Sequence, residues 1–324
     1  MKNRKPIAVT GIGWEIPGWE AKPLLAAIEA TVEYGEFDPK PILGKKGLRY
    51  KDRATLLALC AVHKALQDRG LLDVEPERRV NIGVCVSSNF GNVDTVCLES
   101  EIICREHVDK TSPMNLPVAS SNVIPASIAI RFGFKGINLM LCNGATSGVD
   151  AVHIAANMLR SGRAEKMVVV GVEPLNVITE KLMLECDPEN TTSDRLSHGE
   201  LAACLILEPL ECNSAITSYG TVGEYGFVPS GQAWAPKFSV PDVWFVPTQR
   251  TQRARDLVKN AQGNGFAGVP TIDVSRQTGE LYGALGVFQV LVALLYLKDS
   301  AKKQALVSNG LAFGDGLSSI ELRV

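Results

Sequence analysis

The sequence lacks the signals that mark nucleic-acid, membrane and secreted proteins. The formal net charge of the 324 residues is -2, and no long run of one sign would attract nucleic acid or an anionic lipid surface. No uninterrupted apolar stretch reaches the roughly 18 residues of a membrane span. The eight cysteines form no CxxC pair and mostly lie in apolar segments, which is typical of reduced, buried thiols. We therefore predict a cytoplasmic protein with no nucleic-acid or membrane partner.

Signals for a metal or a cofactor are also missing. No two of the four histidines have a metal-ligand spacing such as HxxxH, so no metal site is expected. A GDG run at 314–316 precedes a strand-like segment, whereas a phosphate-binding loop would precede a helix. We expect no cofactor.

A large α/β core is what the sequence does contain. Hydrophobic residues make up 46% of the chain, and buried-strand patterns at 7–12, 81–88, 137–141, 167–173 and 201–208 alternate with helical patterns at 54–70 and 146–161. Residues 281–298 form a nearly all-apolar helix that belongs in the centre of the molecule. Residues 305–324 predict two strands around a glycine-rich turn. The segment 213–240 has no clear period and predicts a crossing between two halves or an irregular surface loop.

The segment CNGATSGV at 142–149 leads from a strand directly into a helix. Nucleophiles are often held at such a turn, because the helix N-terminus favours an anion there. At the apparent tip stands Ala145, which has no reactive group. Cys142 is the competing nucleophile, although a thiol at a strand end is more often a packing residue. Thr146 and Ser147 are predicted to cap the helix.

Four collinear segments resemble the β-ketoacyl synthase branch of the thiolase-fold condensing enzymes. In that family, segments similar to 112–173, 197–209, 277–299 and 308–322 carry the nucleophile turn with its central helix, a glycine-rich turn with a strand, a Thr-Gly-His run opening a buried helix, and an Asn-Ser-Phe-Gly-Phe-Gly-Gly motif. The resemblance implies a thiolase-like α/β/α/β/α layered fold of two pseudo-repeated halves. We place the halves at 1–212 and 213–324, the second being shortened.

The resemblance also implies that the catalytic side chains are gone. The family uses a Cys nucleophile and two His residues that assist decarboxylation and stabilise the developing negative charge. Ala145 falls on the nucleophile and Glu280 on one His, while the strand expected before the other His, at 242–252, contains none. We therefore assign no catalytic residue. The substrate-binding residues that the resemblance implies are Ala145, His198, Leu311 and Phe313.

A member of this family that lacks all three catalytic groups resembles a chain length factor. Such a subunit pairs with an active ketosynthase in type II polyketide or aryl-polyene biosynthesis and shapes its acyl tunnel. Whether it contacts acyl carrier protein directly stays open. The interface residues that the resemblance implies are Asn122, Val123, Ile124, Ser127, Asn138 and Met140.

Two alternatives remain open from the sequence. The chain could be an active homodimeric ketosynthase-like acyltransferase or malonyl decarboxylase that uses Cys142 or a hydroxyl, with Glu280 as base. Ala145 could also be an engineered replacement of a native Cys, although Glu280 and the missing histidine count against this.

Overall fold

The computed structural model describes residues 5–19, 23–75, 79–186, 198–210, 217–234, 238–312 and 314–324. Its strands are β1 (Ile7–Glu15), β2 (Ile82–Ser87), β3 (Asn138–Leu141), β4 (Lys166–Glu173), β5 (Leu201–Pro209), β6 (Gly220–Val228), β7 (Val243–Phe245), β8 (Thr271–Ile272), β9 (Gln304–Gly310) and β10 (Leu317–Arg323). Its α-helices are α1 (Lys40–Leu43), α2 (Arg53–Arg69), α3 (Val93–Glu106), α4 (Val123–Phe132), α5 (Ser147–Arg160), α6 (Val177–Cys186), α7 (Gln252–Gly263), α8 (Ser275–Thr278) and α9 (Tyr282–Asp299). Short 3-10 turns include η4 (Leu116–Ala119) and η5 (Gly144–Thr146).

The sheet repeats one strand order twice. Its ten strands run β3-β2-β4-β5-β1-β6-β10-β9-β7-β8. Counted from the first strand of each half, both halves have the order third, second, fourth, fifth, first. In both, the fifth strand is antiparallel to its two neighbours, while the second is parallel to the third and fourth. The expectation of two pseudo-repeated halves is thus confirmed, whereas the boundary near 212 stays a prediction.

Strand β6 lies within 213–240, where a crossing between two halves or an irregular surface loop was expected, so the surface-loop alternative is wrong for residues 220–228. It pairs antiparallel with β10 and with the start of β1, so it joins the two half-sheets. Its glycines hide the alternation on which strand prediction depends. They are needed for close contacts: a Cβ on Gly226 would lie 2.9 Å from the ring of Phe238, and one on Gly223 would lie 3.0 Å from Glu321.

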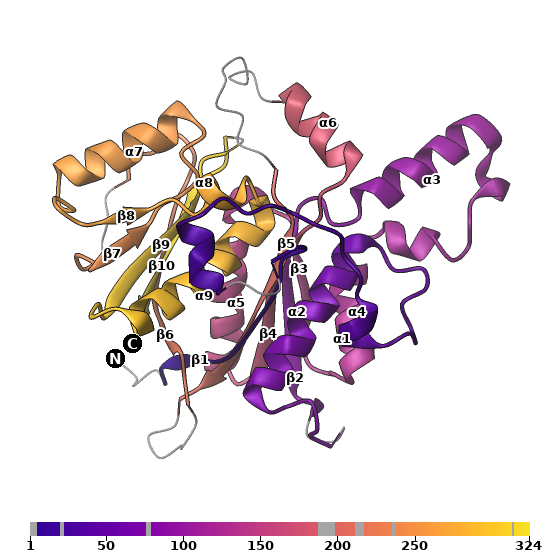
Figure 1. The fold of residues 1–324 in the computed structure, drawn as a ribbon, viewed down its shortest axis with the longest axis horizontal. Coiled ribbons are helices and arrows are strands. Elements are labelled where there is room, and N and C mark those ends of the chain that lie inside the picture. The colour runs from indigo at the N-terminus through magenta and orange to yellow at the C-terminus, as the bar shows by residue number, and fades with distance from the viewer. Residues whose placement is uncertain are drawn as a thin grey trace.

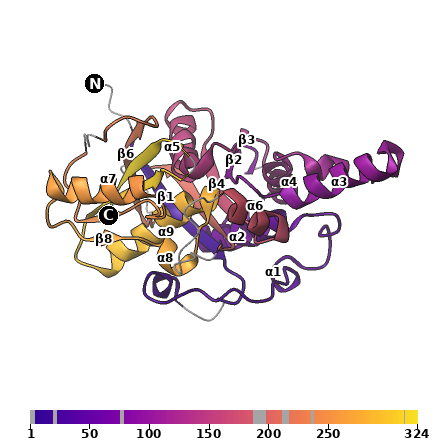
Figure 2. The same cartoon turned by 90° about the horizontal axis from the view of Figure 1, so that it is seen from above.

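Helices cover both faces of the sheet and fill its middle. Helix α2 packs against β1 and β5, and α7 covers the face of β7 and β9 at the other end (Figure 1). Helices α5 and α9 cross between the two half-sheets, which gives the layered order expected (Figure 2). Among the described helices, α9 alone is long and apolar enough to span a membrane, but 78% of the window is buried. Its composition reflects this central position.

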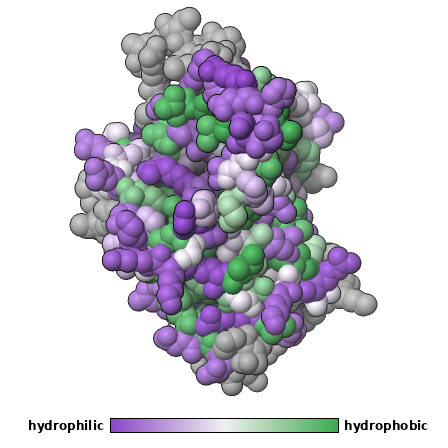
Figure 3. All heavy atoms as spheres, turned by 90° about the vertical axis from the view of Figure 1, so that its right-hand side faces the viewer, coloured by the Kyte–Doolittle hydropathy of each residue, from purple (hydrophilic) through white to green (hydrophobic). Residues whose placement is uncertain are grey.

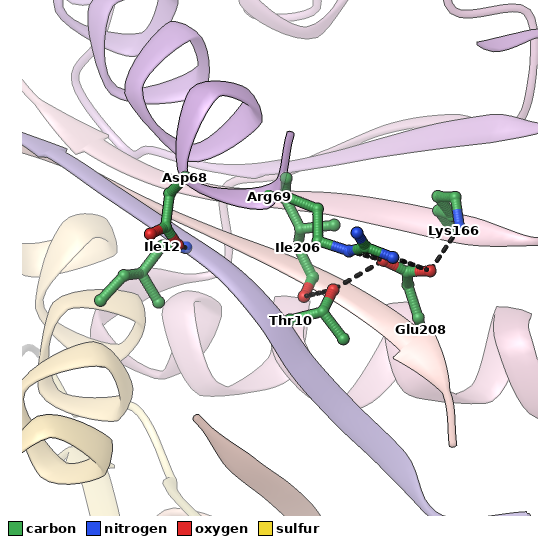
Figure 4. A network of polar contacts seen from close by, with 7 residues as sticks. All are labelled: Thr10, Ile12, Asp68, Arg69, Lys166, Ile206 and Glu208. Atoms are coloured by element: carbon green, nitrogen blue, oxygen red, sulfur yellow. Dashed lines mark hydrogen bonds and ion pairs between the residues drawn. The ribbon is translucent and has the colours of Figure 1, made fainter. Parts of the chain in front are cut away.

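A buried ionic cluster ties the outer helix α2 to the sheet (Figure 4). The carboxylate of Glu208 accepts hydrogen bonds from Arg69 at 2.6 Å and from Thr10 at 2.7 Å, and it also pairs with Lys166. The residue before Arg69 in α2, Asp68, accepts from the backbone N–H of Ile12 at 2.9 Å, beside the register shift in β1. These contacts fix the register of β1 against α2 and β5.

The first half ends in an exposed edge and a projecting arm. In the part of the chain that the structure describes, β3 has β2 as its one sheet neighbour. Helix α3 and the turns after it extend away from the body (Figures 1 and 2). The face toward which they project has hydrophobic patches among polar ones (Figure 3). Exposed apolar side chains of the segment 93–119, here called the α3 arm, are Val96, Leu98, Ile103, Val108, Met114 and Leu116.

Candidate active site

The turn η5 places Ala145 at the entrance to the central helix α5. The side chain of Ala145 is fully buried. Asn89 holds the preceding residue on both sides, accepting from the N–H of Gly144 at 3.2 Å and donating to its carbonyl at 2.9 Å. Gly144 has φ +84°, a conformation that suits glycine. The turn is therefore fixed, with a methyl group at its tip.

A carboxylate from the far end of the chain reaches this turn. The backbone N–H of Ala145 donates to Oδ2 of Asp315 at 2.8 Å, and the N–H of Ala312 donates to Oδ1 at 2.8 Å. Asp315 lies in the loop between β9 and β10. Its carboxylate thus bridges that loop and the η5 turn.

A second carboxylate fixes the first turn of α5. Oδ2 of Asp150 accepts from Asn143 at 2.6 Å and from Thr146 at 2.9 Å. Its Oδ1 accepts from Tyr225 at 2.8 Å and also from Ser318. The expectation that Thr146 and Ser147 cap the helix is wrong, because α5 has no side-chain cap bond. Ser147 instead donates to the carbonyl of Gly144 at 2.6 Å.

Glu280 is fully buried at the entrance to α9. It accepts from the N–H groups of Leu281 at 3.1 Å and Tyr282 at 2.9 Å. Burial raises the pKa of Glu280, against the opposing effects of the Tyr282 N–H and the charge of Arg250. His198 lies beside it: the two residues form a β-bridge, and the imidazole stacks near the ring of Tyr282 with centroids 6.2 Å apart. The structure thus brings together two residues that the sequence singled out.

Glu173 links this region to the η5 turn. Its carboxylate accepts from the N–H groups of Asn89 at 2.5 Å, Phe90 at 3.0 Å and Gly283 at 3.2 Å. Burial raises the pKa of Glu173 to about 7, although these hydrogen bonds act in the opposite direction. Asn89 therefore contacts the η5 turn through its side chain. Its backbone N–H donates to Glu173, which also accepts from the N–H of Gly283 in α9.

Cys142 lies on the exposed side of the turn. Partial burial raises the pKa of its thiol, outweighing a hydrogen bond with Ser121. A raised pKa disfavours the thiolate, which is the reactive form. The raised pKa therefore disfavours Cys142 as a nucleophile.

The remaining predicted residues fall in different places. Leu311 is buried and has φ +65°, while Phe313 lies outside the described residues. Asn122 and Asn138 are exposed, and Val123 and Met140 are half-buried. Ile124 corrects the interface prediction, because its side chain is fully buried in the core under α2. Ser127 is also buried and accepts from Lys51 at 3.0 Å; with Val123 it lines a cavity of about 290 Å³.

A larger cavity, of about 480 Å³, lies elsewhere, between β1 and the end of α2. None of its lining residues belongs to the η5 turn. Its polar side chains already serve the fold: Lys64 pairs with Glu15 at 2.8 Å, and Asp68 accepts from Tyr219 at 2.9 Å. We assign it no part in the site. Among the described residues, no group of three His, Cys, Asp or Glu side chains is placed to hold a metal ion.

Sequence reasoning missed Asp315 and Asp150. The GDG run at 314–316 was the available signal for Asp315, since a carboxylate in an otherwise glycine-rich turn usually binds backbone N–H groups. Asp150 gave no signal, because an acidic residue in the first turn of a helix is common.

The repeated strand order and the two crossed central helices define the thiolase-like fold. Comparison with known proteins then identifies the family: the model described as "Beta-ketoacyl synthase, N-terminal domain" matches residues 23–195, more than half of the chain. The chain belongs to the β-ketoacyl synthase family.

Individual relatives are distant in sequence and close in fold. The 3-oxoacyl-[acyl-carrier-protein] synthase 2 of Coxiella burnetii is 22% identical over 84% of this chain and 76% of its own length. The ishigamide ketosynthase/chain length factor has a TM-score of 0.81 at 14% identity, covering 99% of both chains. AntDE:AntF, a type II polyketide acyl carrier protein in complex with its ketosynthase, contains a chain with a TM-score of 0.78 at 16% identity, also covering 99% of both.

Proposed function

We propose that this chain is a non-catalytic ketosynthase-like subunit of the chain-length-factor type. The observation that carries the proposal is Ala145, a buried methyl group at the tip of the turn where the family holds its nucleophile. A methyl group cannot form a thioester. Glu280 offers a carboxyl group held by two backbone N–H groups where an imidazole would be needed.

The partner in this proposal is an active β-ketoacyl synthase. Two features support a protein partner at this side of the molecule. Strand β3 is at the edge of the sheet, and unpaired strand edges favour pairing with another chain. The α3 arm carries six exposed apolar side chains, three of them on α3 itself, and groups of exposed apolar side chains mark protein–protein interaction sites. Both neighbours named above have a ketosynthase in a complex, with a chain length factor or an acyl carrier protein.

The role we propose is steric. In the heterodimer, the partner's cysteine would carry the acyl chain, and this subunit would close one end of the tunnel and limit how many malonyl units fit. Val123 and Met140 are half-buried at the same end of the molecule and are the candidates for contact with the tunnel. The pathway would be of the type II polyketide or aryl-polyene kind. We place the protein in the cytoplasm, consistent with the free thiols of Cys60, Cys85 and Cys204 in its core.

The decisive experiment compares this chain alone, a ketosynthase alone and the two co-expressed. Each sample receives malonyl- and acyl-loaded carrier protein, and intact mass and carbon dioxide release are measured. We expect no added mass and no decarboxylation for this chain alone, and condensation only where the ketosynthase is present. Acylation of Cys142 in the isolated chain would contradict the proposal and favour an enzyme of its own.

Co-purification tests the partner claim independently. A tagged ketosynthase from the same genome should retain this chain through size exclusion at the mass of a heterodimer. A stable homodimer that binds none of the ketosynthases of that genome would contradict the assignment.

A further inference from the structure

The carboxylate of Asp315 accepts hydrogen bonds from two backbone N–H groups, one of which belongs to Ala145. Oδ2 of Asp315 accepts from Ala145 at 2.8 Å, and its Oδ1 accepts from Ala312 at 2.8 Å. The two donors belong to segments far apart in the sequence, the η5 turn and the loop 311–316. Each N–H group donates to a different oxygen of the Asp315 carboxylate.

Acyl transfer needs such N–H groups to be available. Attack on a thioester puts negative charge on its carbonyl oxygen, and enzymes stabilise that oxygen with preorganised donors, often including the backbone N–H of the nucleophile residue itself. Here the N–H at the nucleophile position already donates to a carboxylate. An arriving oxyanion would lose this donor and would also face a like charge at short range.

We propose that Asp315 is a built-in occupant of the oxyanion position, so that this chain lacks an anion site as well as a nucleophile. The inference deepens the proposed function and rests on it, since it assumes that Ala145 stands at the nucleophile position. It predicts that restoring sulfur alone does not restore acylation. Asp315 is therefore a residue that keeps this subunit inert within a complex that handles reactive thioesters.

The loop around Asp315 holds the carboxylate in place. The N–H of Leu311 donates to the carbonyl of Gly316 at 3.0 Å, which closes the loop, and Thr251 donates to the carbonyl of Leu311 at 2.9 Å. On the other side, a Cβ on Gly144 would stand 2.9 Å from Oδ2 of Asp315. The carboxylate is thus packed directly against the turn, and an acyl group would have to displace it.

The test compares the variants A145C, A145C/D315G and A145C/D315N with the unsubstituted chain as the blank for native cysteines. The probe is octanoyl-N-acetylcysteamine thioester. In the step measured, the introduced thiolate attacks the thioester carbonyl, a new carbon–sulfur bond forms, and the oxyanion collapses to release N-acetylcysteamine thiolate, which takes up a proton. Intact mass gives the rate of octanoyl transfer, and fragment spectra locate it.

Alkylation by iodoacetamide is the matched control. Displacement of iodide by the same thiolate passes through no oxyanion, so its rate reports access and thiolate content alone. We expect the ratio of acylation to alkylation rates to rise at least ten-fold from A145C to A145C/D315G. In A145C/D315N we expect a smaller rise, because Asn removes the negative charge and one of the two acceptor oxygens but still fills the site.

An unchanged ratio across the three variants, or alkylation without acylation in all of them, would overturn the role of Asp315. Thermal unfolding of each variant shows whether it is folded, and the Asn variant carries the test if the Gly variant is not. Retention by a tagged ketosynthase is measured on the same samples. If the tagged ketosynthase does not retain the unsubstituted chain, the proposed function is contradicted instead, so the two failures are distinguishable.

Discussion

Gly148 of α5 and Gly286 of α9 are in direct backbone contact. A Cβ on Gly148 would lie 2.8 Å from both the Cα and the N of Gly286, and one on Gly286 would lie 2.5 Å from the N of Val149. The two central helices therefore cross at their glycines, three residues after Ala145. This crossing sets the position of the η5 turn relative to the entrance of α9.

We expect Gly148→Ala to destabilise the protein by about 1–3 kcal/mol or more, because the added methyl meets backbone atoms that cannot rotate away. The control is Gly263→Ala in α7, where a Cβ would meet nothing within 4 Å. Alanine is the better helix former there, so that variant should be neutral or slightly more stable. Urea unfolding followed by circular dichroism measures both. Equal effects of the two substitutions would argue against the close crossing.

Acid should weaken the cluster around Glu208. Burial alone would raise the pKa of Glu208, but hydrogen bonds from Arg69, Lys166 and Thr10 outweigh burial and lower it below the ordinary value. The unfolded state then binds a proton more readily, so this contribution is complete above the ordinary pKa of about 4.3 and is lost as pH falls through the lower folded value. Glu208→Gln should cost about 3 kcal/mol at pH 7, since it leaves two cations without their carboxylate. Unfolding free energies measured between pH 3 and pH 7 should converge for the two proteins at the acid end.

Glu173 should give the opposite pH dependence. Its folded pKa, about 7, lies above the unfolded value because burial favours the neutral form. This contribution is therefore complete below about pH 4.3 and is lost as pH rises through about 7, on the order of 3 kcal/mol in total. Glu173→Gln should remove the slope between those limits in the same unfolding measurements. Glu101→Gln, at an exposed pair with Arg105, is the control, and a matching loss of slope there would contradict the assignment.

The α3 arm should determine binding to the ketosynthase. Leu98 is 51% exposed, and Leu98→Asp would place a charge in the proposed interface, where it would lose its water. We expect at least ten-fold weaker binding, measured by titration calorimetry. Val240, 61% exposed in the second half of the chain, provides the control Val240→Asp. Equal binding by both variants would contradict an interface at the α3 arm.

Much of the fold was predictable because it depends on local patterns. The apolar period of 54–70 and the all-apolar run at 281–298 correspond to α2 and α9, and the strand runs correspond to β2, β4 and β5. Strand β6 was missed because its glycines serve close packing and leave little hydrophobic alternation. Ile124 was assigned to the interface by the resemblance alone, and only the structure shows that its side of α4 faces the core.

The sequence by itself determined that Ala145 has no thiol and that Glu280 carries a carboxyl group and not an imidazole, since each fact is a property of one residue. Only the tertiary structure decided what those residues meet. Asp315 is 170 positions from Ala145, and the two come together because β9 and β10 belong to the second half-sheet, whose end lies over the start of α5. No local pattern encodes such a contact, because it depends on how the two halves of the sheet pack on their shared central helices.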